Sequence, residues 1–110
     1  MPELANLLDD LPPPQRDEVM HVLLARPGVR IERIVSHGQA SPPGFLYDQP
    51  HGEWVLLVQG AAQLRLEYDQ FLELRPGSFV HLPPHRRHRV EWTDPAQTTI
   101  WLAVHYEEAA

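Results

Sequence analysis

Residues 53–92 read EWVLLVQGAAQLRLEYDQFLELRPGSFVHLPPHRRHRVEW. The stretch opens with an apolar run and continues as short alternating segments separated by turn residues. The turns fall at Gln59-Gly60, Tyr68-Asp69-Gln70, Arg75-Pro76-Gly77 and Pro83-Pro84-His85. Strands this short and evenly spaced, with little helix between them, are typical of a β-sandwich or a β-barrel.

The same pattern continues on both sides of this stretch. Upstream, residues 29–35 also predict a strand, with apolar and polar side chains alternating from Val29 to Glu32. Residues 18–25 fit either a short helix or a strand, and the turn that follows them, Arg26-Pro27-Gly28, favours a strand. A short strand is expected at residues 45–48, and residues 98–106 predict a long last strand.

The domain organisation predicted from the sequence is simple. Residues 1–16 form an N-terminal arm, with a helical turn at about residues 4–9 and a proline run at residues 12–14. Residues 17–110 form one all-β barrel domain, because 110 residues are enough for a single sizeable core.

Composition excludes several classes of chemistry. The chain has no cysteine, so disulfides, thiolate metal sites and cysteine nucleophiles are absent. All nine basic residues are arginine, which excludes lysine Schiff bases and a P-loop lysine. The net charge of −6 argues against nucleic acid as a partner. No apolar run is long enough to span a membrane and no signal peptide is evident, so we expect a cytoplasmic protein.

The candidate functional residues lie in two motifs with defined spacing. In the first, six residues separate Glu53 from Gly60. In the second, five residues separate Gly77 from Pro83, and His85 and His88 follow. This order resembles the two motifs of the cupin superfamily. The resemblance implies a jelly-roll barrel, also called a double-stranded β-helix, with a divalent metal ion bound inside it by histidines and a glutamate.

The resemblance is incomplete in the first motif, because no His-x-His precedes Glu53. With a spacing of four residues the two positions are Leu46 and Asp48. With a spacing of three residues they are Tyr47 and Gln49. We prefer the first spacing, because it leaves Pro50 in a turn, and it predicts that Asp48 and Glu53 project inward opposite His88. In the second motif, His85 stands where cupins have a glycine, and Trp92 where they have an asparagine.

The resemblance implies a metal set of Asp48, Glu53 and His88, with His51, His85 or Gln49 as a further ligand. Two carboxylates and a histidine suit Zn, Fe, Mn or Ni. The alternative is a metal-free barrel in which Glu53 and His88 bond to each other, since a buried carboxylate needs a partner.

Other side chains are weaker candidates for a ligand pocket. They are Tyr47 and Gln49 from the first motif, and Trp101 and His105 from one face of the last strand.

Three functions therefore stay open. The protein is a metal-dependent enzyme, a non-catalytic module that senses or stores a small polar molecule, or a structural barrel. We also expect a homodimer, because apolar residues occupy both faces of several strands.

Overall fold

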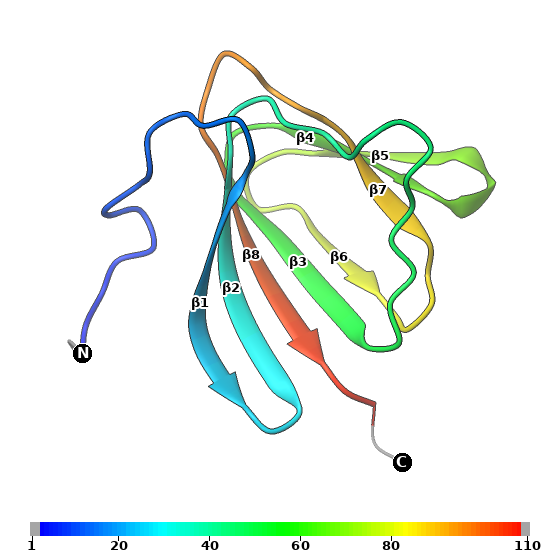
Figure 1. Ribbon diagram of the computed structural model, residues 1–110, viewed down its shortest axis with the longest axis horizontal. Helices are drawn as coiled ribbons and strands as arrows, with labels where there is room; N and C mark the ends of the chain where they lie inside the picture. Colours follow the sequence, from blue (N-terminus) through cyan, green and yellow to red (C-terminus); the bar gives the residue numbers. More distant parts are fainter. Residues whose placement is uncertain (1–2, 109–110) are drawn as a thin grey trace.

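The computed structural model describes residues 3–108 and is built almost entirely of antiparallel strands. Figure 1 shows two sheets that face each other, with the five-stranded sheet below and the three-stranded sheet above and to the right. The larger sheet has the order β1-β2-β8-β3-β6 and the smaller one β5-β4-β7. The strands are β1 (Val19–Arg26), β2 (Val29–Ser36), β3 (Gly52–Gln59), β4 (Ala62–Leu66), β5 (Gln70–Leu74), β6 (Phe79–Leu82), β7 (His88–Thr93) and β8 (Thr99–Tyr106).

The prediction of an all-β jelly-roll fold is confirmed, and so is a strand within residues 18–25. The strand expected at residues 45–48 is reduced to one antiparallel bridge between Tyr47 and His88. A short 3-10 helix, Glu67–Asp69, joins β4 to β5. Within residues 3–108, no helix is long and apolar enough to cross a bilayer.

Strand β8 occupies the centre of the larger sheet. It pairs along its whole length with β2, from Val29 opposite Tyr106 to Ser36 opposite Thr99. Its other edge pairs with β3, so that Glu53 lies opposite His105. The last strand therefore fixes the spacing between two strands that are distant in the chain.

The core lies between the two sheets. It is formed by aliphatic side chains from β3, β4, β5 and β6 together with Trp101 and Ala103 of β8. Leu57 and Ala103 are completely buried. Because side chains alternate along a strand, the same faces that build this core also aim polar residues between the sheets.

The N-terminal segment packs against the outer face of β2. The guanidinium of Arg33 donates hydrogen bonds to the carbonyl oxygens of Leu7 (3.0 Å) and Asp9 (2.6 Å). Arg33 is only 8% exposed as a result. This contact covers a face of β2 that would otherwise meet solvent.

Candidate functional site

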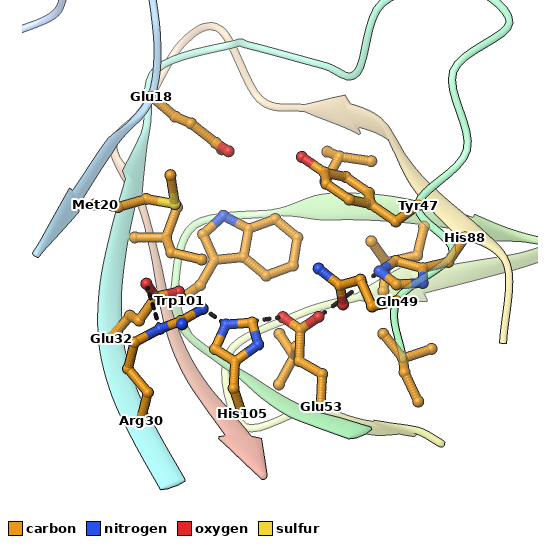
Figure 2. Close-up of a pocket in the computed structure, with 15 residues that line it drawn as sticks. Glu18, Met20, Arg30, Glu32, Tyr47, Gln49, Glu53, His88, Trp101 and His105 are labelled. Atoms are coloured by element: carbon orange, nitrogen blue, oxygen red, sulfur yellow. Dashed lines mark hydrogen bonds and ion pairs between the residues drawn. The ribbon is translucent and has the colours of Figure 1, made fainter. Parts of the chain in front are cut away.

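A cavity of about 240 Å³ opens between the sheets, and four of the eight buried polar side chains among the described residues line it. Figure 2 shows side chains that line it converging from β1, β2, β3, β7 and β8 and from the segments just before β1 and β3. We call it the inner cavity; its polar and aromatic lining consists of Glu18, Arg30, Glu32, Tyr47, Gln49, Glu53, His88, Trp101 and His105. Aliphatic side chains, such as Val55, Leu64 and Leu82, complete the wall.

Glu53 and His88 face each other at one end of the inner cavity. Glu53 is the second residue of β3, just after a turn, and His88 is the first residue of β7. His88 Nε2 lies 3.8 Å from Glu53 Oε1, which is too long for a hydrogen bond. His88 Nδ1 lies 2.9 Å from the carbonyl oxygen of Arg86. Because a carbonyl only accepts, Nδ1 carries the proton, and the lone pair of neutral His88 is on Nε2, facing the carboxyl group.

Burial shifts the protonation of both groups toward their neutral forms. Desolvation, with a smaller contribution from the nearby Glu32 carboxylate, raises the pKa of Glu53 to about 7. Desolvation also lowers the pKa of His88 below its usual value. Near neutral pH the pair is therefore a partly protonated carboxyl group beside a neutral imidazole, each without a hydrogen bond to the other.

A second polar chain runs along the same wall. His105 Nε2 donates to Glu32 Oε1 at 2.8 Å, and Arg30 Nε donates to Glu32 Oε2 at 3.2 Å. Because Nε2 of His105 carries its proton, Nδ1 accepts, and His51 Nε2 lies 3.0 Å away as the donor. His105 Nε2 is also 4.0 Å from Glu53 Oε2. Glu32 and Arg30 thus neutralise each other, whereas Glu53 stays outside this chain of bonds.

Glu18 enters the inner cavity from the position just before β1. Its Oε2 accepts a hydrogen bond from Ser36 Oγ at 3.2 Å. The Ser36 oxygen in turn accepts from Trp101 Nε1 at 3.1 Å. Burial raises the pKa of Glu18 above its usual value.

The structure places the first-motif residues in the register that we did not prefer. Tyr47 pairs directly with His88, so the two side chains lie on the same side of the sheet. Since the chain alternates, Tyr47 and Gln49 line the inner cavity, whereas Leu46 and Asp48 point away from it. The expectation that Asp48 projects inward beside Glu53 is wrong. Its carboxylate is 48% exposed and bonds to His85 Nδ1 at 2.7 Å.

The remaining predicted residues divide between the cavity and the surface. Trp101 and His105 lie in the lining, both on the inward face of β8. His85 is exposed and lies outside the lining, because its φ of +63° turns the chain at the position where cupins have glycine. His51 lies behind His105, where it lines a separate surface pocket with Arg26.

Sequence reasoning missed three polar residues of the lining, Glu18, Arg30 and Glu32. Arg30 and Glu32 alternate with Ile31 and Arg33 along β2, which is a pattern typical of a strand with one face in solvent. The polar face is in fact the inward one, and the N-terminal segment covers the other. The same pattern gave no indication that Ser36 is fully buried.

The comparison with solved structures decides the family. A Ralstonia eutropha JMP134 protein, described as a candidate mannose-6-phosphate isomerase, is 50% identical, with 97% of this chain and 100% of that chain covered and a TM-score of 0.93. A cupin superfamily protein from Desulfitobacterium hafniense DCB-2 aligns over 98% of this chain and 94% of its own, with a TM-score of 0.78 and 16% identity. The chain belongs to the cupin superfamily. An RmlC-like cupin from Desulfovibrio desulfuricans shares the fold at 14% identity, over 96% of this chain and 97% of that one, with a TM-score of 0.74.

Sequence comparison adds one curated relative of this cupin. The RCS-specific HTH-type transcriptional activator RclR of Escherichia coli K12 is 36% identical over 64 residues, which is 52% of this chain and 22% of RclR. The cupin therefore matches only about a fifth of the length of that relative. No family model matches the sequence.

Proposed function

We propose that this cupin binds a small polar molecule in the inner cavity, with a hydroxyl or amine group of the ligand placed between Glu53 and His88. The observation that carries the proposal is Glu53 itself. It is 8% exposed, and within residues 3–108 its carboxyl group makes no hydrogen bond. Its carboxyl group lines the inner cavity, so a donor group of a bound ligand can form the hydrogen bond that no described residue supplies.

The protonation states indicate which group fits. His88 Nε2 offers a lone pair, and the Glu53 carboxyl group only accepts when it is ionised, a form that is partly populated near neutral pH. Two neighbouring acceptors call for a donor, which an alcohol, an amine or an ammonium group supplies. A carbonyl or a carboxylate of a ligand would add a third acceptor at the same point.

The charge of the lining argues against a phosphorylated ligand, despite the description of the Ralstonia relative. Among the described residues, three glutamates and a single arginine line the inner cavity. That arginine, Arg30, is already paired with Glu32. A sugar phosphate would bring further negative charge close to Glu18 and Glu53, and this arginine is not free to offset it. The resemblance to part of a transcriptional activator favours recognition of a ligand over its conversion.

A thermal-shift experiment tests the proposal. A panel of small diols, amino alcohols and amines is titrated into the wild type, Glu53→Gln and the control Glu73→Gln, whose carboxylate is exposed on β5. We expect at least one compound to raise the melting temperature of the wild type and the control by several degrees. The amide introduced by Glu53→Gln can donate to His88 Nε2 and fill the gap, so this variant should respond weakly. Equal responses of all three proteins, or none, would contradict the proposal.

A divalent metal ion is the second candidate, because Nδ1 of His88 is anchored on a carbonyl and Nε2 is free, as in metal-binding histidines. Glu53, His88 and the Gln49 side chain would hold it. Within residues 3–108, no group of three or more His, Asp or Glu has the spacing for a metal, so the ion would rest on fewer protein ligands than usual. When bound, Zn, Fe, Mn or Ni would act as a Lewis acid on a ligand oxygen.

Metal analysis separates the two candidates. Protein purified without chelator is examined by elemental analysis, and then dialysed against ZnCl₂ or MnCl₂. A near-stoichiometric ion that is lost in His88→Gln and kept in the control His85→Gln supports the metal. Protein without metal after this treatment leaves the organic ligand as the occupant.

A further inference from the structure

We propose that the end of the inner cavity formed by Glu18, Tyr47 and Trp101 is a binding site for a small organic cation of the quaternary ammonium class. The inference rests on the proposed function, since it specifies the part of the ligand that lies farther from Glu53 and His88. Figure 2 shows the Glu18 carboxyl group and the Tyr47 hydroxyl pointing toward each other across this end of the cavity.

The first step of the argument is that Glu18 is held in place. Ser36 is completely buried and connects the Trp101 indole N–H to Glu18 Oε2. One carboxylate oxygen is therefore fixed by the protein. Figure 2 shows the carboxyl group directed into the cavity, where the other oxygen can meet a ligand. Such a fixed carboxylate is suited to a charge-assisted hydrogen bond or an ion pair with a bound cation.

The second step is the charge balance. The glutamates at positions 18, 32 and 53 outnumber Arg30 in the lining, and Arg30 and Glu32 form an ion pair. The remaining carboxyl groups belong to Glu18 and Glu53. The Glu53 side chain is 11% exposed, is aimed into the cavity and makes no hydrogen bond within the described part of the chain. This second group independently indicates that the cavity accommodates positive charge or donors.

The third step is the character and size of the walls. The Tyr47 ring stacks on His88 with centroids 5.3 Å apart, and Trp101, which is 3% exposed, lines the same cavity. Aromatic rings attract organic cations through their negative faces. The whole inner cavity has a volume of about 240 Å³, so a small alkylammonium ion has room at one end of it.

Three probes of nearly equal shape test the charge requirement. They are tetramethylammonium, which is cationic, tert-butanol, which is neutral, and pivalate, which is anionic. Binding is followed through the assigned indole N–H signal of Trp101 in two-dimensional NMR spectra of the full chain. We expect tetramethylammonium alone to shift this signal in a saturable manner.

Matched variants then locate the site. In Glu18→Gln the side chain keeps its shape and an acceptor for Ser36 but loses its charge, and we expect about tenfold weaker binding of tetramethylammonium. The control Glu73→Gln makes the same change outside the inner cavity and should bind like the wild type. Equal binding by Glu18→Gln and the wild type, an equal response to tert-butanol, or no response to tetramethylammonium would overturn the proposal. A response to MnCl₂ without one to tetramethylammonium would also overturn it.

The experiment distinguishes this inference from the proposed function. Tetramethylammonium has no hydroxyl or N–H group, so it tests the Glu18 end without a donor for Glu53 and His88. If it fails to bind while an alcohol still stabilises the wild type and not Glu53→Gln, only the cation site is rejected. If it binds and the response to alcohols and amines does not depend on Glu53→Gln, the cation site stands and the proposed role of Glu53 is rejected.

Discussion

Glu53 Oε1 and His88 Nε2 lie 3.8 Å apart, with the lone pair of the imidazole directed at the carboxyl group. Neither group can form a strong bond to the other while His88 is neutral and Glu53 is ionised, since both are then acceptors. This relationship makes the stability of the barrel sensitive to pH and to whatever enters the gap.

The stability of the folded protein should depend on pH because the pKa of Glu53 is shifted. Its pKa is raised from 4.5 to about 7 in the folded protein, so its stabilising contribution is fully present below pH 4.5 and is lost as the pH rises to about 7. We expect Glu53→Gln to gain up to about 3 kcal/mol relative to the wild type between pH 4.5 and pH 8. Urea unfolding of both proteins across this range measures the difference. Parallel stability curves would show that Glu53 does not titrate in this way.

The protonation of His88 is a separate prediction. We expect the neutral tautomer with the proton on Nδ1, because the Arg86 carbonyl accepts from it, and a pKa below the usual histidine value because of burial. Nitrogen-15 NMR of the imidazole ring reports both properties. The exposed His85, whose ring bonds to Asp48, provides an internal comparison. A proton on Nε2 at neutral pH would contradict the proposed acceptor role.

Gly60, the last residue of the first motif, is required for two reasons. Its φ is +96°, and a Cβ there would lie 2.6 Å from the Thr99 Cα. Gly77 has a similar φ of +94° and open space around it. We expect Gly77→Ala to cost about 1–2 kcal/mol through backbone strain alone, and Gly60→Ala to cost roughly 1–3 kcal/mol more through steric overlap. Chemical denaturation of both variants checks this difference, and equal costs would contradict it.

His85 should be replaceable without loss of ligand binding. Its left-handed backbone suits glycine, so His85→Gly is expected to be more stable than His85→Ala by about 1 kcal/mol. Both variants should bind ligand or metal as the wild type does, because His85 lies outside the inner cavity. Loss of binding in both, with the fold intact by circular dichroism, would restore His85 as a candidate ligand.

The homodimer stays a prediction, and the structure suggests where to test it. Phe79 on β6 is 65% exposed, and its ring lies 5.5 Å from that of Trp54 on the outer face of the larger sheet. We expect Phe79→Ser to weaken association in light scattering, whereas Phe71→Ser on β5, which removes another exposed phenylalanine, should not. A monomer at micromolar concentration for the wild type would refute the dimer.

The fold was largely predictable because the turn residues and the alternation between them are local signals. The strands from residue 19 to residue 36 and from residue 52 to residue 106 follow those signals closely. The cavity was less predictable, since the orientation of Tyr47 and Asp48 depends on one bridge to His88, which no local pattern encodes. Glu32 was not predicted for a different reason. A polar strand face has the same sequence pattern whether it meets solvent or a polar cavity.

The central position of β8 has a consequence for folding. Glu32 on β2 and Glu53 on β3 come to opposite sides of His105 only when β8 has inserted between their strands. Contacts that join such distant segments slow folding, because the loops must close before the pairing stabilises them. The chain therefore has to be synthesised as far as Tyr106 before its cavity can exist. Until then, the edge of β2 and the edge of β3 that will face β8 are unpaired and open to association with other chains.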